Sequence, residues 1–323
     1  MRQVVSLVAK ATITLVLLYF AVGHTNFSLI GERLNRLDIA WLLAALAVVG
    51  AQLVLISVRW QAVAQRCGAP LTLRRALRFN LIASFFNQVL PSTVGGDAVR
   101  IWLFAREGAG WSKATYSVLL DRFIGVLALA ILVVIFLPWG LELIANPIGQ
   151  AALLLIGFGS IGSALAFIAV GYFRWDRLQQ WSPTRHLTQM AVTAREILIA
   201  ARTGPPLMVL SLFVHVLSAA IAWCAARAVA SPFEFVHALL LLPPVMLIAT
   251  IPISIAGWGV RESALVLAFS YAGLSESDGL IVSVLLGGAY FVFGLMGGAV
   301  WLLSREPMRF SAAWRSSGTP PPV

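Results

Sequence analysis

The most constraining feature of this 323-residue sequence is a series of long apolar runs that recurs along its whole length. A helix needs about 20 mostly apolar residues to cross the hydrocarbon core of a bilayer. The runs that meet this length are Val5–Gly23, Ala40–Val58, Ala114–Leu137, Ala151–Phe173, Leu207–Val229 and Gly279–Leu303. Only 11% of the residues are charged, against roughly 25% in a typical soluble domain. The sequence therefore predicts an all-α polytopic membrane protein without a soluble catalytic domain.

Basic residues gather in some of the connecting segments and are missing from others. Pro138–Gln150 and Tyr271–Asp278 contain no Lys or Arg. Among the basic positions elsewhere, those that flank or connect the apolar runs include Arg2, Lys10, Arg59, Arg66, Arg74, Arg75, Arg78, Arg174, Arg177, Arg185, Arg195, Arg202, Arg305, Arg309 and Arg315. Because cytoplasmic loops carry the excess of Lys and Arg, we expect both termini on the cytoplasmic side of a bacterial inner membrane. The net charge of +10 thus reflects the orientation of the chain in the membrane and not a nucleic-acid-binding surface, so we expect no nucleic-acid partner.

Two further apolar segments are interrupted by helix-breaking residues. The first, Phe79–Phe104, is too short to cross the membrane core twice, and Pro-Ser-Thr-Val-Gly-Gly at positions 91–96 cannot continue a helix. Basic residues lie on both sides of it, so we expect a re-entrant hairpin with both ends in the cytoplasm. The second segment, His237–Tyr271, has a similar break within Ile251–Glu262.

The two breaks match each other at a constant shift of 161 positions, as from Pro91 to Pro252. The other matched pairs are Val94 with Ile255, Gly96 with Gly257, Val99 with Val260, and Arg100 with Arg261. Each half has the order span, span, broken hairpin, span. Because three full crossings separate equivalent elements, the second half has the opposite orientation in the membrane, as in many transporters.

We therefore predict six full transmembrane helices plus two re-entrant broken-helix hairpins in an inverted repeat. The single membrane domain covers residues 1–323, with halves at about 1–145 and 146–305 and a cytoplasmic tail at 306–323. The first run has the pattern of a secretory signal before Ala21-Val22-Gly23. Its cleavage would destroy the parity of the repeat, so we expect an uncleaved anchor.

Short motifs at the breaks and in the third run carry a family resemblance. They are Leu90-Pro91-Ser92, Gly95-Gly96-Asp97 with Arg100, Asp121-Arg122, and Pro252, Gly257, Gly259, Val260, Arg261 and Glu262. In these motifs the chain resembles the transmembrane, flippase-like region of lysylphosphatidylglycerol synthases and its stand-alone relatives. The resemblance implies a lipid-handling or flippase-like role, with Asp97, Arg100, Arg122, Arg261 and Glu262 at the matching positions. The aminoacyl-transferase domain of the two-domain synthases is not in this sequence, so their enzymatic activity is not implied.

A lipid translocator must give a polar headgroup a path through hydrocarbon, which requires a cavity with fixed charge. Non-helical backbone at membrane depth is tolerated where it lines such a cavity. The helix that restarts after Gly95-Gly96 would present free N–H groups to a phosphate, and Arg100 and Arg261 would hold it from opposite sides. The predicted substrate-binding residues are Pro91, Ser92, Gly95, Gly96, Asp97, Arg100, Arg122, Pro252, Gly257, Arg261 and Glu262.

Several of these residues also have a structural interpretation. Asp97 would cap its helix and pair with Arg100, Glu262 would neutralise a buried arginine from another element, and Arg122 would extend to the cytoplasmic surface. His215 is interpreted as a helix–helix hydrogen-bond partner.

Features outside the candidate site have a structural interpretation as well. We interpret Arg59 and Arg75 as orientation signals. The glycines of the last run indicate close helix packing; they are Gly287, Gly288, Gly294, Gly297 and Gly298.

The sequence gives no support for an enzyme. It contains no metal-ligand spacing, no nucleophile elbow and no nucleotide-binding loop, so we expect no catalytic residues, no metal and no cofactor. The expected partner is a membrane lipid, with aminoacylated phosphatidylglycerol, another anionic phospholipid, a polyprenyl phosphate and a hopanoid derivative all open.

A non-transporting accessory protein of a lipid-synthesis complex is the alternative. It would dock an enzyme partner through the amphipathic segment Arg174–Pro206, whose apolar positions are Leu187, Met190, Ile197, Leu198 and Ala201. Association with further copies of the same chain, to form a homo-oligomer, is also open.

Overall fold

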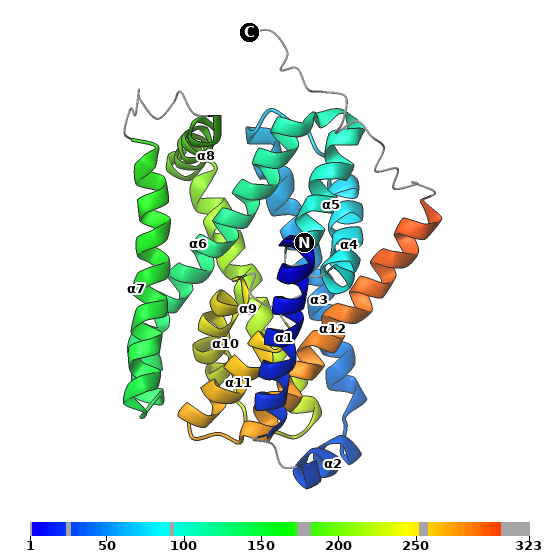
Figure 1. Ribbon diagram of the computed structural model, residues 1–323, viewed down its shortest axis with the longest axis vertical. Helices are drawn as coiled ribbons and strands as arrows, with labels where there is room; N and C mark the ends of the chain where they lie inside the picture. The colour runs from blue at the N-terminus through cyan, green and yellow to red at the C-terminus, as the bar shows by residue number, and fades with distance from the viewer. Residues whose placement is uncertain (1, 24–26, 91–93, 173–181, 252–257, 305–323) are drawn as a thin grey trace.

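The computed structural model describes residues 2–23, 27–90, 94–172, 182–251 and 258–304, and its regular elements there are all helical (Figure 1). The helices are α1 (Arg2–Gly23), α2 (Phe27–Asn35), α3 (Ile39–Arg66), α4 (Leu73–Val89), α5 (Gly95–Phe104), the π-helical turn η1 (Ala105–Ala109), α6 (Trp111–Leu143), α7 (Pro147–Val170), α8 (Ser182–Ile199), α9 (Gly204–Ala228), α10 (Phe235–Ala249), α11 (Val260–Tyr271) and α12 (Glu276–Leu303). The predicted site residues Pro91, Ser92, Pro252 and Gly257 lie outside the described residues.

Five helices, α3, α6, α7, α9 and α12, are long and apolar enough to cross a membrane. They coincide with five of the six predicted runs, so the prediction of an all-helical membrane protein is confirmed. The remaining run lies in the 22-residue helix α1. The count of six spans and the re-entrant position of the hairpins remain predictions.

Both predicted breaks separate two helices that pack against each other. Helix α4 ends at Val89 and α5 starts at Gly95, while α10 ends at Ala249 and α11 starts at Val260. The pairs α4–α5 and α10–α11 are each in contact. Two adjacent glycines allow the first pair to approach closely, because an added Cβ at Gly95 would meet Leu90 and one at Gly96 would lie 2.5 Å from the Ala83 carbonyl oxygen.

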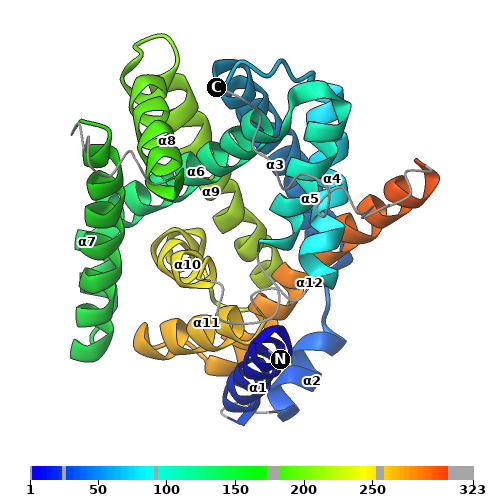
Figure 2. The same cartoon turned by 45° about the horizontal axis from the view of Figure 1, so that its top comes forward.

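Helices α3 and α9 pack side by side in opposite directions at the centre of the molecule. The Asp38 N–H donates to the Ala228 carbonyl at 2.8 Å near one end of the pair, and the Gln52 amide donates to the Val214 carbonyl at 2.9 Å in the middle. Two further contacts join helices from different halves of the chain. Helix α4 packs on α12, and α10 packs on α6 (Figures 1 and 2).

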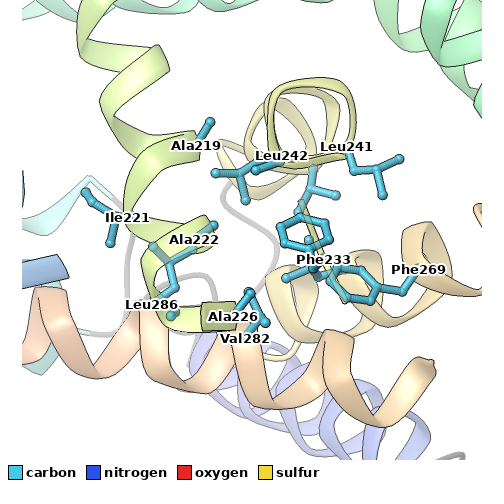
Figure 3. Close-up of a cluster of buried hydrophobic side chains, with 14 of the residues drawn as sticks. Ala219, Ile221, Ala222, Ala226, Phe233, Leu241, Leu242, Phe269, Val282 and Leu286 are labelled. Carbon is cyan, nitrogen blue, oxygen red and sulfur yellow. The ribbon is translucent and has the colours of Figure 1, made fainter. Parts of the chain in front are cut away.

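A large hydrophobic cluster fixes the second half around α10. Figure 3 shows α9 presenting the small residues Ala222 and Ala226 next to α12, while Leu241 and Leu242 come from α10. Phe233 stacks on Phe269 of α11 with ring centroids 4.6 Å apart. Small residues let helices approach closely in a membrane, so the side chains of this cluster pack against one another and not against lipid. These packing contacts stabilise the bundle.

The amphipathic segment forms helix α8, which contacts α6, α7 and α9. Its Ala191, Ala194 and Ile197 are buried, whereas Leu187 is exposed. Helix α8 therefore uses most of its apolar face to pack against its own chain.

The glycines of α12 allow it to pack tightly on α4, as their spacing predicts. A Cβ added at Gly297 would overlap the Leu81 carbonyl, whereas one added at Gly288 would meet nothing within 4 Å. We expect Gly297→Ala to cost about 1–3 kcal/mol through overpacking, and the matched Gly288→Ala to be neutral or slightly stabilising. Melting temperatures of the purified variants in detergent measure this, and equal temperatures would contradict the packing.

Candidate functional site

Six helices line an open cavity of about 380 Å³. This volume falls in the range of about 300–1,000 Å³ that is usual for small-molecule sites. Helices α3, α5, α6, α9, α10 and α12 supply the walls, so the cavity lies beside both helix breaks. Its lining residues are Gln52, Ile56, Arg59, Asp97, Arg100, Asp121, Arg122, Gly125, Val126, Leu129, Val214, His215, Ser218, Met246, Ala249, Thr250 and Tyr290.

An arginine–aspartate cluster forms the charged part of this wall. It consists of Arg59, Asp97, Arg100, Asp121 and Arg122. Asp121 accepts from Arg59 at 2.8 Å and from Arg100 at 3.0 Å. Asp97 accepts from Arg100 at 3.4 Å and from Arg122. Three guanidinium groups thus face two carboxylates, and the cluster carries one positive charge in excess.

Most of the cluster is shielded from solvent. Asp121 is 1% exposed, and Arg59, Asp97 and Arg100 are also buried. The side chain of Arg122 is the most open member, at 33% exposed. Because an unpaired ion in a low-dielectric interior is strongly unfavourable, these alternating pairs are what allow several charges to remain inside an apolar bundle.

Arg100 is held at the centre of the cluster by three kinds of contact. It bridges Asp97 and Asp121, and its guanidinium lies over the Trp60 ring at 4.1 Å. Its Nε has no hydrogen-bond partner among the described residues. Arg100 therefore keeps one buried donor that the rest of the described chain does not use.

The start of α5 places Asp97 and Arg100 at the cavity. Asp97 lies in the first turn, where the positive end of the helix dipole favours a carboxylate. The N-cap position, however, is Val94, and Asp97 does not cap the helix. The Gly96 N–H, at the start of the same helix, donates to the Asn87 side chain at 2.8 Å. The two glycines thus serve the contact between α4 and α5.

Neutral polar groups continue the cavity wall away from the cluster. Gln52 of α3 donates to Ser218 at 2.6 Å and accepts from the Tyr290 hydroxyl at 3.1 Å. His215 bonds the Gly125 carbonyl at 2.8 Å, which agrees with its interpretation as a helix–helix partner.

A second cavity of about 170 Å³ adjoins the first one. The two cavities share Gln52, Ile56 and Tyr290 as wall residues. The other residues of the second cavity are Val49, Leu53, Ser84, Asn87, Gln88 and Phe293.

The matched arginine of the second half does not line the main cavity. Arg261 pairs with Glu262, its neighbour in sequence, and donates through Nε to Ser283 at 3.1 Å. Glu262 is fully buried and also accepts the Gly259 N–H at 2.7 Å. In place of Arg261, the second half contributes the end of α10, with Ala249 and Thr250. The geometry thus brings Asp97, Arg100 and Arg122 together and leaves Arg261 and Glu262 in a separate pair.

Two central members of the cluster were not recognised as site residues from the sequence. Arg59 was interpreted as an orientation signal, which is wrong, because α3 continues to Arg66 and buries Arg59 against Asp121. Asp121 stood next to Arg122 in the family motif but received no role. An acidic residue inside an apolar run is itself a signal, since such residues almost always face a partner within the bundle.

Comparisons with known proteins agree with this architecture. A family model described as the lysylphosphatidylglycerol synthase TM region matches residues 7–298. The comparison with curated proteins and the comparison with solved structures each gave no match. The family match and the apolar helices indicate an integral membrane protein and are consistent with a place in lipid metabolism. The chain therefore belongs to the family of the lysylphosphatidylglycerol synthase transmembrane region.

Proposed function

We propose that this protein binds the phosphate of an anionic lipid headgroup in the main cavity and moves that lipid between the leaflets of the bacterial inner membrane. The observation that carries the proposal is the excess positive charge of the arginine–aspartate cluster at a cavity inside an apolar bundle. Two buried carboxylates need only two arginines for neutrality. The charge of the third arginine is balanced when an anion enters, and guanidinium groups bind phosphate through paired hydrogen bonds.

The arrangement of the helices supports movement as well as binding. We propose that the two halves form an inverted repeat, with α3 to α6 equivalent to α9 to α12. The crossed contacts support this, since α4–α12 and α10–α6 exchange under that equivalence, as do α3–α6 and α9–α12. Inverted repeats with broken helices around a central site are common among transporters. We propose no catalytic step, so the movement would be downhill or coupled to an ion gradient.

The proposed orientation predicts how single cysteines are labelled in intact cells. Ala145→Cys, after α6, should react with an impermeant maleimide from outside, and Thr72→Cys, before α4, should react only after the cells are opened. Both positions are exposed. Background from Cys67 should be small, because burial raises the pKa of its thiol to about 11 and little reactive thiolate exists near neutral pH. Outside labelling at Thr72 would contradict the orientation.

The function is tested by lipid movement in proteoliposomes. Purified protein should accelerate the exposure of a fluorescent anionic phospholipid to an external quencher. Arg122→Gln removes the excess charge but leaves each aspartate an arginine partner, so we expect transport to fall about tenfold or more with little change in melting temperature. Arg122→Lys should keep part of the rate, because it retains charge but loses the paired geometry.

The matched control is Arg185→Gln on the exposed side of α8. It makes the same chemical change outside the cavity and should leave transport unchanged. No lipid movement above protein-free vesicles, together with stoichiometric co-purification of a lipid-synthesis enzyme, would contradict transport. That result would favour the accessory role instead.

A further inference from the structure

We infer that the headgroup taken up by this site is a phosphodiester whose distal part is uncharged and carries hydroxyl groups, and that an ammonium-bearing headgroup is disfavoured. This inference rests on the proposed function, since it assumes that the lipid phosphate enters the main cavity. It specifies the chemistry of the remainder of the headgroup.

The first argument is that every carboxylate at the main cavity is already engaged. Both oxygens of Asp121 accept from arginines, one from Arg59 and the other from Arg100. Both oxygens of Asp97 likewise accept from arginines, namely Arg100 and Arg122. The cavity lining contains no further acidic residue among the described residues. An ammonium group would therefore enter a site that offers it no unused counter-charge.

The nearest other carboxylate offers no alternative. Glu262 does not line either cavity, and both of its oxygens are occupied, by Arg261 with Ser283 and by the Gly259 N–H. The two break segments outside the described residues, 91–93 and 252–257, contain no Asp or Glu in the sequence.

The second argument is the charge of the site. The cluster keeps one positive charge in excess, and like charges repel strongly where water is scarce. A phosphate removes this excess, whereas an added ammonium would restore it. A zwitterionic or cationic headgroup thus loses part or all of the electrostatic gain that a singly anionic headgroup obtains.

The third argument is the chemistry of the second cavity. Its polar residues are amides and hydroxyls from three helices, with Ser84, Asn87 and Gln88 from α4 opposite Gln52 and Tyr290. Such groups both donate and accept hydrogen bonds, which suits hydroxyl groups and leaves an ammonium ion undercompensated. The Gln52–Tyr290 hydrogen bond lies in the wall that the two cavities share. We place the phosphate at the arginines and the distal hydroxyls in the second cavity.

The experiment compares three fluorescent lipids with the same acyl chains in proteoliposomes of wild-type protein. Phosphatidylglycerol carries a neutral hydroxylated group, phosphatidylethanolamine one ammonium, and lysyl-phosphatidylglycerol two. We expect phosphatidylglycerol to move at least about tenfold faster than either of the others. Comparable rates for all three would overturn the inference while leaving transport intact. Rates no faster than in protein-free vesicles would instead overturn the proposed function, and the inference with it.

A charge placed in the second cavity tests the location of the distal group. Gln88→Glu has nearly the same shape and introduces one carboxylate there, so it should reduce the preference for phosphatidylglycerol over lysyl-phosphatidylglycerol by several-fold. The matched control is Gln189→Glu on α8, which is exposed and should leave the preference unchanged. A folded Gln88→Glu protein with wild-type preference would overturn the placement. If Gln88→Glu does not fold, Ser84→Asp in the same cavity tests the location in its place, and an unchanged preference in that variant would overturn the placement.

Discussion

Replacing Asp121 by asparagine is expected to lower the thermal stability of the purified protein more than any other single change in the arginine–aspartate cluster. Asp121 is the only described partner that neutralises Arg59, and it shares Arg100 with Asp97. Removing one partner of a buried ion pair leaves an uncompensated charge, which costs about 3–5 kcal/mol. Thermal melting in detergent, followed by aggregation or by tryptophan fluorescence, measures the loss.

The second-site control for this prediction is Arg59→Gln. In the double variant Asp121→Asn with Arg59→Gln, the unpaired guanidinium is gone, so much of the lost stability should return. This non-additivity is the signature of a direct charge pair. A double variant that is less stable than Asp121→Asn alone would show that Arg59 stabilises the bundle by some means other than this pair.

Arg100→Gln is expected to abolish lipid movement while the protein still folds. Asp97 keeps Arg122 and Asp121 keeps Arg59, so each carboxylate retains one partner. The site loses its excess charge and the donor that has no partner in the described chain. Losing one charge-assisted hydrogen bond to a phosphate corresponds to roughly ten- to a hundredfold in rate, and losing the excess charge lowers the rate further. Initial rates with anionic lipid, at equal amounts of reconstituted protein, measure the effect.

Two further variants distinguish a role of Arg100 in binding phosphate from a purely structural role. Arg100→Lys keeps the charge and should recover a minor part of the rate, because an ammonium group makes no paired contact with phosphate. Asp97→Asn combined with Arg100→Gln restores the excess charge but not the guanidinium, and should remain inactive. Full transport by that double variant would show that Arg100 serves only to neutralise Asp97.

The span pattern and the two breaks were predictable because lipid imposes simple rules on the sequence. The apolar runs had to be helices of bilayer length, and Pro with Gly-Gly at positions 91–96 had to interrupt one. The structure places helix ends next to both breaks, as expected. Boundaries were less predictable, as α3 extends past Val58 to Arg66 and carries Arg59 into the interior.

The candidate site could be predicted only in part, because charge pairing depends on which helix faces reach one another. The local motif around Asp97 and Arg100 marked the first break, and the structure brings both to the cavity. Symmetry suggested that Arg261 would join them. Instead, Arg261 pairs with Glu262, the next residue in the chain. Arg100 has no acidic residue directly beside it and pairs with Asp97, three residues earlier, and with Asp121 of α6. The two matched segments thus differ in where their acidic residues lie, and this changes where each arginine is held.

The crossed packing of α4 on α12 and of α10 on α6 has a consequence for the origin of the chain. On the proposed repeat, each hairpin packs against the last long helix of the other half, so each half depends on the other for part of its packing. A half-length ancestor would have been stable only as an antiparallel pair of identical chains, inserted in both orientations and joined along the surface now formed by α3 and α9. On the same proposal, fusion of two copies would have allowed them to diverge and the charges to gather in the first half, where all five members of the arginine–aspartate cluster lie.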